Sequence, residues 1–370
     1  MEFEINSDDL NAGLSNAQGI VEKRTAMPIL SNVLVESIGD GEIKLVATDL
    51  EVGLVCRLAA KVKNPGSMAV SARHLYEVVR GFKNQKVSIK LVENNQVLLK
   101  CGSSEYKFLG MPPEDFQKPV DPEDVGLSKV DAEQLSEMIE KTYFAISTEE
   151  ARHSLNGAFL EKVGDKFRLT ATDGHRLAMV ERPMIREGDF GNITEGLLLP
   201  RKGLMEAKRV IENLKSEASI GHFDNSLVLK VGSTTLVMRL LDGQFPDYRK
   251  VIPDEQKIRF SADRKKLMDS LRRVSIFSVD KNMGVKLTVK KNALLVTNSN
   301  PDLGEAKEEI EIDYTGESMT IGFNARYLLD AMSVMSGEAV SVSMDDDISP
   351  GVFKEQDDPD FTCVVMPMRI

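Results

Sequence analysis

The sequence predicts an α+β fold of three similar domains in tandem, each a doubled β-α-β-β-β unit. Three observations support this prediction. The chain of 370 residues is longer than one domain commonly is. Six amphipathic helical patterns recur at a nearly constant interval, and alternating strand-like runs separate them. We therefore expect domains at residues 1–125, 126–254 and 255–370.

Each helical pattern places apolar residues at the spacing of one helix face, as Leu267, Leu271 and Val274 illustrate. The patterns start near residues 7, 71, 131, 201, 263 and 324, so 60 to 70 residues separate successive starts. Small polar residues that favour the N-terminal cap, and one proline that favours the first turn, open the patterns. These residues are Ser7, Ser71, Asp131, Pro200, Ser261 and Asn324.

The segments between the helices alternate between apolar and polar residues, as strands do. Segments 42–58, 167–183 and 293–312 correspond to one another. In their expected turns stand ATDLE, ATDGH and TNSNP, where Asp, Asn and Gly suit the backbone. Segments 120–126 and 252–256 are rich in Pro and Asp and are expected to link the domains.

Composition limits the class of protein. With 42% hydrophobic and 28% charged residues, the chain is expected to be globular. No run of about 18 apolar residues predicts a membrane-spanning helix, and the acidic start MEFEINSDDL does not resemble a secretory signal. Cys56, Cys101 and Cys363 are far apart and form no CxxC motif. They are expected to be buried free thiols in a reducing cytoplasm.

Charge is distributed unevenly along the chain. The net charge of −11 by itself argues against nucleic-acid binding. Residues 201–215 and 263–275, however, each contain five basic and two acidic residues. These helices either present ordinary solvated faces or form a mildly basic lining for a polyanion such as duplex DNA. Since the chain has no Trp and few aromatics, it offers no stacking platform for single strands.

Six segments together resemble one family. They are MPILSNVLVE (27–36), TATDGHRLAMV (170–180), LPRKG (199–203), LDGQFPDYRKVIP (241–253), IGFNARYLLD (321–330) and VVMPMRI (364–370). In sequence, order and spacing the chain resembles the bacterial sliding clamps, the β subunits of DNA polymerase III, over its whole length. The resemblance implies the DNA-clamp fold: a head-to-tail homodimer closed into a ring around double-stranded DNA, with helices lining the hole and sheets outside.

The resemblance also implies partners and excludes catalysis. A clamp loader containing the δ subunit opens such rings with ATP. The DNA polymerase III α subunit, other polymerases and repair proteins dock through short clamp-binding peptides. No catalytic residue, cofactor or metal is implied, and no membrane contact. The expected location is the bacterial cytoplasm, at the nucleoid.

Three sets of site residues follow from the resemblance. The peptide pocket, between the second and third domains, would comprise Leu155, Asn156, Thr172, Gly174, His175, Arg176, Leu177, Pro246, Arg249, Val251, Val364, Met366, Pro367, Met368 and Arg369. The DNA-facing residues would be Arg24, Arg73, Arg152, His153, Arg201, Lys202 and Asn324. The dimer interface would pair His74, Tyr106, Lys107 and Phe108 with Ile276, Phe277, Glu305, Glu308 and Glu309.

Within these sets, the apolar and methionine side chains would form a slot that accepts varied ligands, with a Leu or Phe anchor filling it. Arg176 and Arg369 would meet the peptide at its rim. The chain departs from its relatives at two places. His153 and Ser154 stand where family members often have two aromatics, and Ser103 and Glu105 stand where relatives have arginines. The resemblance therefore does not predict the ion pairs of the interface.

Other functions remain open at this point. Asp173 and His175 would be a candidate catalytic pair, but the chain has no GxSxG, P-loop or HExxH motif. The acidic run at 345–347 lacks the spacing and the glycine of an EF-hand calcium loop. A three-domain scaffold that binds peptides without encircling DNA is the main alternative.

Overall fold

The computed structural model describes residues 1–22, 26–119, 125–149, 151–188, 196–253, 256–278 and 283–369. The chain forms two compact units. The first unit contains residues 1–136, 184–192 and 202–240, and the second unit contains residues 137–183, 193–201 and 241–370. Within the described residues, no helix is long and apolar enough to cross a membrane.

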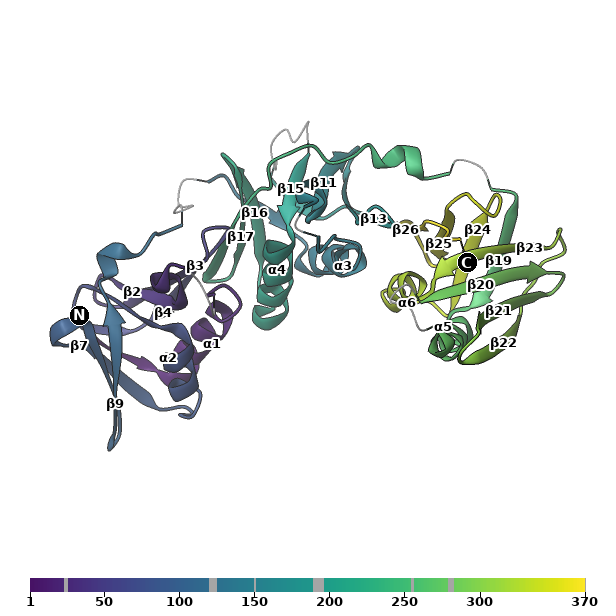
Figure 1. Ribbon diagram of the computed structural model, residues 1–370. Coiled ribbons are helices and arrows are strands. Elements are labelled where there is room, and N and C mark those ends of the chain that lie inside the picture. The colour runs from purple at the N-terminus through teal and green to yellow at the C-terminus, as the bar shows by residue number, and fades with distance from the viewer. Residues whose placement is uncertain are drawn as a thin grey trace. The chain divides into compact units, whose positions relative to one another are not determined.

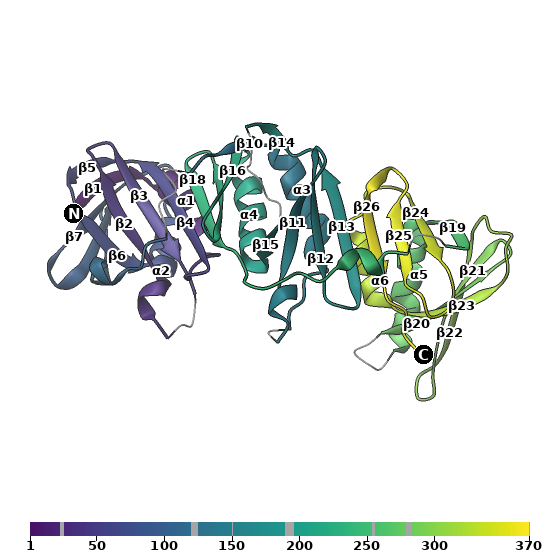
Figure 2. The same cartoon turned by 90° about the horizontal axis from the view of Figure 1, so that it is seen from above.

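The first unit is built on an antiparallel sheet of fourteen strands (Figures 1 and 2). Their order is β14-β10-β16-β17-β18-β4-β3-β2-β6-β9-β8-β7-β1-β5. The strands are β1 (Glu2–Asn6), β2 (Asn32–Ile38), β3 (Glu42–Thr48), β4 (Val52–Ala59), β5 (Lys61–Asn64), β6 (Ser67–Ser71), β7 (Lys86–Leu91), β8 (Gln96–Cys101), β9 (Ser104–Met111), β10 (Ser128–Val130), β14 (Ile185–Glu187), β16 (Ala218–Phe223), β17 (Ser226–Val231) and β18 (Thr234–Arg239). Helices α1 (Ser7–Ala17) and α2 (Ala72–Val79) pack against each other on this sheet.

The second unit contains a sheet of eight strands, β15-β11-β12-β13-β26-β25-β24-β19, and one of four, β22-β21-β20-β23. The strands are β11 (Gly157–Val163), β12 (Lys166–Thr172), β13 (Arg176–Arg182), β15 (Leu197–Pro200), β19 (Ile258–Asp263), β20 (Gly284–Lys290), β21 (Ala293–Asn300), β22 (Gly304–Glu311), β23 (Met319–Asn324), β24 (Ala339–Met344), β25 (Gly351–Glu355) and β26 (Asp358–Val365). Helices α5 (Arg264–Val274) and α6 (Ala325–Ser333) pack together here. The remaining helices are α3 (Ala132–Tyr143) and α4 (Arg201–Leu214).

All six expected helices are present, and most of the expected caps are confirmed. Ser71 accepts from the N–H of His74, Asp131 from two N–H groups of α3, and Asn324 from the N–H of Arg326. Three expectations at helix starts were wrong. Asn6 rather than Ser7 caps α1, and Asp263 rather than Ser261 caps α5, since strand β19 continues to the cap. Pro200 ends strand β15, and α4 begins one residue later.

Backbone pairing joins strands that come from different expected domains. At the first seam, β4 pairs with β18, and at the second seam, β13 pairs with β26 (Figure 2). These seams extend the sheets beyond single repeats. The compact units therefore cut through the expected middle domain, whose strands are divided between the two large sheets.

The same turn chemistry recurs in the three repeats. Asp49, Asp173 and Asn300 each follow or end a strand, and each Oδ1 accepts hydrogen bonds from the N–H groups two and three residues later, at 2.6–3.3 Å. Such Asx turns fix the direction of the following strand. Because each turn precedes the equivalent strand of its repeat, the turns allow residues of β4, β13 and β22 to be aligned with one another.

Within the described residues, six strands end a sheet, namely β5, β14, β15, β19, β22 and β23, and β9 is open along most of one side. Strand β22 pairs with β21 alone, and β9 pairs with β8 along residues 104–109 but meets β6 only at Gly110 and Met111. Strand β9 belongs to the first repeat and strand β22 to the third.

The described cysteines are free and buried, as expected. Burial raises the pKa of the Cys56 thiol to about 11 and that of Cys363 to about 12, so both are protonated and unreactive at neutral pH.

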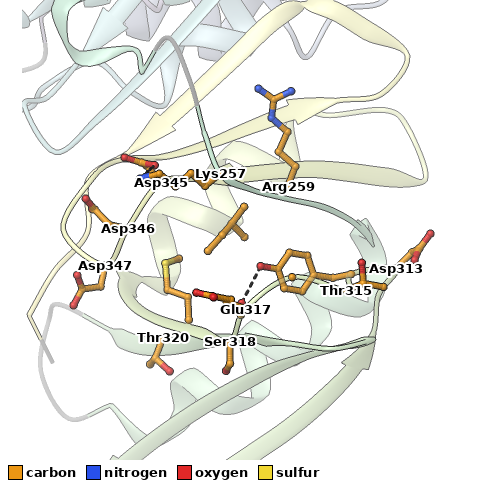
Figure 3. A pocket seen from close by; sticks show the side chains of 14 residues that line it. Lys257, Arg259, Asp313, Thr315, Glu317, Ser318, Thr320, Asp345, Asp346 and Asp347 are labelled. Atoms are coloured by element: carbon orange, nitrogen blue, oxygen red, sulfur yellow. Dashed lines mark hydrogen bonds and ion pairs between the residues drawn. The ribbon is translucent and has the colours of Figure 1, made fainter.

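A polar cleft opens between the segment 313–320 and the turn at 345–347 in the second unit (Figure 3). The Lys257 ammonium lies 2.9 Å from Asp345, and the Tyr314 hydroxyl donates to the carbonyl of Glu317 at 2.8 Å. Asp346 accepts from two backbone N–H groups of its own turn. These contacts stabilise the loops themselves.

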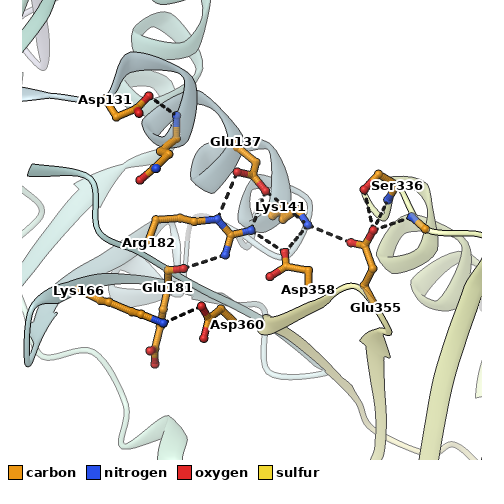
Figure 4. Close-up of polar contacts among 12 residues, drawn as sticks. Asp131, Glu137, Lys141, Lys166, Glu181, Arg182, Ser336, Glu355, Asp358 and Asp360 are labelled. Carbon is orange, nitrogen blue, oxygen red and sulfur yellow. Dashed lines mark hydrogen bonds and ion pairs between the residues drawn. The ribbon is translucent and has the colours of Figure 1, made fainter.

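A buried ion network fastens α3 to the hairpin of β25 and β26 (Figure 4). The Lys141 ammonium lies 3.0 Å from Glu355 and 2.6 Å from Asp358, and Arg182 bridges Asp358 and Glu137. Only 6% of the Lys141 side chain and 1% of the Glu355 side chain are exposed. Glu355 also accepts from the backbone N–H groups of residues 336 and 337. The network therefore ties the second repeat to the third.

The charges in this network depend on one another. Burial opposes ionisation of Asp358, but hydrogen bonds from Arg182 and Lys141 outweigh it and lower the pKa of that carboxyl. Burial likewise opposes ionisation of Glu355, and its bonds to Ser336 and Lys141 lower its pKa. A carboxyl group whose pKa is lowered by folding stabilises the folded state at every pH above its ordinary pKa. That stabilisation is lost as the pH falls through the lowered pKa.

We predict that Lys141→Met reduces the stability of the second seam by about 3–5 kcal/mol, because it leaves the buried Glu355 without its cation and Asp358 with Arg182 alone. It also raises the pH at which acid opens the seam, since the pKa of both carboxyls then rises. Hydrogen exchange of the β13 and β26 amides measures both effects. Lys166→Met is the control, because Lys166 pairs with Asp360 on the same sheet but at the surface. Equal protection of these amides from exchange in the two variants would contradict a stabilising role of Lys141 at the second seam.

Candidate functional site

An apolar pocket of about 240 Å³ lies on the second seam. Leu177 on β13 and Val364 on β26, which are paired directly, form its floor. The full lining is Leu155, Thr172, Gly174, Arg176, Leu177, Pro246, Asp247, Tyr248, Val251, Val364 and Met366. Leu177 and Val364 also belong to a larger buried cluster with Leu198, Phe245 and Val352. The pocket is thus a surface opening onto a packed core, the type of site that binds apolar anchors.

The segment that follows β18 forms one wall of the pocket. Phe245 stacks on Phe159 at a centroid distance of 5.2 Å, and the short helix Tyr248–Val251 places two lining residues. The Tyr248 hydroxyl donates to Glu161 and accepts from Arg168. Burial and the neighbouring Glu161 raise the pKa of Tyr248. This wall is therefore held by both packing and hydrogen bonds.

The turn between β12 and β13 forms the opposite wall. Gly174 has a φ of +87°, which disfavours other residues, and a Cβ there would lie 2.8 Å from the Arg152 guanidinium. Arg152 donates to the carbonyl of Asp173 at 2.7 Å. Glycine at this position lets the arginine close against the turn.

Arg176 lines the pocket but does not have the expected rim position. Its guanidinium donates to Asp173, to Asp330 on α6 and to the carbonyl of Phe144. It also lies 4.5 Å from the centre of the Tyr327 ring, and its side chain is 10% exposed. With these partners, Arg176 fastens β13 to α6 and positions the seam beneath the pocket.

Nine of the fifteen expected pocket residues line the cavity: Leu155, Thr172, Gly174, Arg176, Leu177, Pro246, Val251, Val364 and Met366. Six others do not line it: Asn156, His175, Arg249, Pro367, Met368 and Arg369. The tail nevertheless stays close, since the N–H of Met366 donates to the carbonyl of His175 and that of Met368 to Gly322. Asp247 and Tyr248 were missed, although they stand inside the segment FPDYRKV that predicted their neighbours.

The equivalent place on the first seam is filled by the chain itself. Counted from the turn residues Asp49 and Asp173, Gly53 corresponds to Leu177. A Cβ at Gly53 would lie 2.4 Å from Pro119, and Phe116 is buried in the local cluster. The segment at 113–119 therefore covers this seam, whereas its counterpart at 246–251 lines a pocket on the second seam.

The residues expected to face DNA have different surroundings. Arg73 is 66% exposed and pairs with Glu77 on its own helix. Lys202 instead contacts the buried Asp49 and donates to the carbonyl of Ile20, and the Arg201 guanidinium donates to the Tyr143 hydroxyl and lies over its ring. Asn324 caps α6. The remaining expected residues are Arg152, described above, His153 in a short 3₁₀ helix, and Arg24, which lies outside the described residues.

The candidate catalytic and metal-binding groups find no support in the geometry. Asp173 accepts from the backbone N–H of His175, and the His175 ring lies 6.3 Å from that of Tyr327. The pair therefore forms a turn rather than a proton-transfer couple. Among the described residues, no group of three His, Cys, Asp or Glu side chains is arranged to hold a metal ion.

Three family models match consecutive parts of the chain. They are described as the N-terminal, central and C-terminal domains of the DNA polymerase III beta subunit, and they match residues 1–119, 129–247 and 249–369. The three tandem clamp domains predicted from the repeats are thereby confirmed. The boundaries at 125 and 254 remain predictions.

Individual relatives match over the full length of both chains. The beta sliding clamp of Caulobacter vibrioides is 35% identical over 379 residues, and that of Escherichia coli K12 is 31% identical over 372 residues. Among solved structures, the DNA polymerase III subunit beta of Pseudomonas aeruginosa matches with a TM-score of 0.93 and 33% identity. A P. aeruginosa sliding clamp bound to griselimycin matches with a TM-score of 0.92 and 32% identity. Both structures also match over 100% of each chain.

The chain belongs to the family of the DNA polymerase III beta subunit, the bacterial sliding clamps, which are processivity factors of the replicative polymerase without catalytic activity of their own.

Proposed function

We propose that two copies of this chain close head to tail into a ring that encircles duplex DNA and holds replication proteins on it. The observation that carries the proposal is that β9 and β22, the counterparts of the strands that pair at the two seams, have open edges. Each internal junction between repeats is closed by strand pairing, and the first and third repeats keep open edges at β9 and β22. A second copy would satisfy the backbone groups of both edges.

The expected interface residues support this closure. Tyr106, Lys107 and Phe108 stand on β9, with His74 on α2, and Glu305, Glu308 and Glu309 stand on β22, with Ile276 and Phe277 at the end of α5. Ile276 is 72% exposed and Tyr106 is 39% exposed, so both side chains are available for contact with a second copy.

The DNA would be held by topology rather than by affinity. A chain with a net charge of −11 is a poor binder of phosphates, but a closed ring needs only a weak and sequence-independent attraction. Arg73 and the exposed Lys265 and Lys266 on α5 suit such diffuse contact. Lys202 is better suited to the first seam, where it neutralises Asp49.

The pocket on the second seam would bind the clamp-binding peptides of its partners. These partners are the DNA polymerase III α subunit, the δ subunit of the clamp loader, and other polymerases and repair proteins. The pocket's apolar floor and its Met366 suit Leu and Phe anchors of varied sequence. The family also implies a cytoplasmic, nucleoid-associated location for the ring.

We predict that Met366→Glu weakens binding of a fluorescent peptide with adjacent Leu and Phe anchors at least about tenfold, because it places a charge in an apolar slot. Fluorescence anisotropy measures the affinity. Met205→Glu is the matched control, since Met205 is 46% exposed on α4 and does not line the pocket. Unchanged peptide affinity in Met366→Glu would refute the pocket assignment.

Encirclement is tested by retention on DNA. Labelled protein is loaded on nicked circular duplex DNA by a compatible clamp loader with ATP. We expect slow loss from circles and rapid loss after the circles are linearised, because a ring slides off free ends. Equal rapid loss from both, with a loader competent on another clamp, would favour the scaffold that binds peptides alone. Equal tight retention on both would mean ordinary phosphate binding.

A further inference from the structure

We infer that the two open edges pair in one register, with Glu105 opposite the partner's Lys307 and Lys107 opposite the partner's Glu305, and that these charges select the register. The inference rests on the proposed ring and specifies how it closes. It is derived from the two seams that the chain already forms.

Both internal seams can be described from the same position on the strand that follows the turn. At the first seam, Leu54 is opposite Leu236, and at the second seam, Ala178 is opposite Cys363. Within the preceding hairpins, Leu54 is opposite Ala47 and Ala178 is opposite Ala171. In both repeats this hairpin partner stands two residues before the Asp of the Asx turn. The position of the Asx turn therefore identifies the equivalent seam residues Leu54 and Ala178.

The same relation between the Asx turn and the hairpin partner locates the equivalent residue on the open edge of the third repeat. Two residues before Asn300 stands Asn298, which is opposite Ala306. Ala306 on β22 thus corresponds to Leu54 and to Ala178. The turn of the third repeat is one residue longer than the turns of the first two repeats. The alignment therefore uses the strand before the turn, because an alignment from Asn300 onward would shift β22 by one residue and place its side chains on the wrong face.

The open edge of the first repeat is aligned through its hairpin. Gly102 and Gly232 both have a φ of +56° in two-residue turns, with Cys101 opposite Ser104 and Val231 opposite Thr234. Tyr106 on β9 therefore corresponds to Leu236 on β18. Transferred to two copies, the seam register places Tyr106 opposite the partner's Ala306.

This register matches side chains in size and charge. On the helix side, Tyr106 would face Ala306 and Phe108 would face Gly304, so a large side chain meets a small one each time. Tyr106 packs on Phe82, and Glu308 binds Arg273 of α5, which confirms that both faces point to the helices. On the other face, Glu105 would lie opposite the partner's Lys307, and Lys107 would lie opposite the partner's Glu305. Each strand thus supplies the acid of one cross-strand ion pair and the base of the other.

Shifted registers are penalised. A slip of one residue would turn the aromatics away from the helices. A slip of two residues one way would place Glu105 opposite Glu305, and a slip the other way would place Glu105 opposite Glu309 and Lys107 opposite Lys307. Like charges directly opposite destabilise a sheet. The alternation of acid and base on both strands therefore favours the one register over its neighbours.

Charge reversal tests the pairs. We expect Glu105→Lys and Lys307→Glu each to weaken the dimer roughly tenfold, and the double variant to recover most of the loss. Analytical ultracentrifugation measures the dimer dissociation constant. Glu309→Lys is the matched control, because in this register Glu309 faces the uncharged Ser103 and its reversal leaves the dimer unchanged. A tighter dimer in Glu309→Lys, or no recovery in the double variant, would overturn the register.

Cysteine pairs test the geometry independently. Under mild oxidation, the variant carrying Glu105→Cys and Lys307→Cys should form a covalent dimer, and the variant carrying Glu105→Cys and Glu309→Cys should not. Cross-linking of the second pair alone, or of neither pair in a protein that sediments as a dimer, would refute this register and leave the ring intact. A wild-type protein that stays monomeric at micromolar concentration would refute the ring itself.

Discussion

Backbone hydrogen bonding between edge strands is the interaction on which the rest of this structure depends. An edge strand exposes unpaired N–H and C=O groups along one side. Pairing of β4 with β18 and of β13 with β26 removes two pairs of edges and makes sheets that extend across repeats. Within the described residues the edges at β9 and β22 stay open, and the proposed ring pairs them with a second copy.

The two seams also differ in what covers them. The same junction geometry gives a filled groove at the first seam, where Pro119 lies over Gly53, and a pocket at the second seam, which Leu177 and Val364 line. Long-range ion pairs stiffen the second junction: Lys141 reaches the hairpin of β25 and β26, and Arg176 reaches Asp330. A rigid apolar pocket on a fixed seam would need little reorganisation to accept the peptide anchor proposed above.

Local rules in the sequence predicted the repeats well. Helical periodicity and small polar caps located six helices, and the Asp and Asn turns located the hairpins, because both signals act over a few residues. The cap of α5 was misplaced since Ser261 and Asp263 are equally suitable by residue type, and only the length of β19 decides between them. The structural contacts of Arg176 and Lys202 could not be predicted from the sequence. Arg176 binds Asp330 and Lys202 binds Asp49, and in each pair the two residues are about 150 residues apart and are brought close by a seam. Tyr248 was missed for a related reason, as its contact with Arg168 forms only in the folded unit.

Hydrogen exchange at different protein concentrations tests the central claim most directly, namely that pairing of the open edges completes the molecule. At concentrations where the protein is dimeric, the amides of β9 and β22 that point away from their own hairpins should be protected, and dilution into the monomer should expose them. Amides of β8 and β21 should keep their protection throughout. Rapid exchange of β9 and β22 at every concentration, in a protein shown by its mass to be dimeric, would contradict the account.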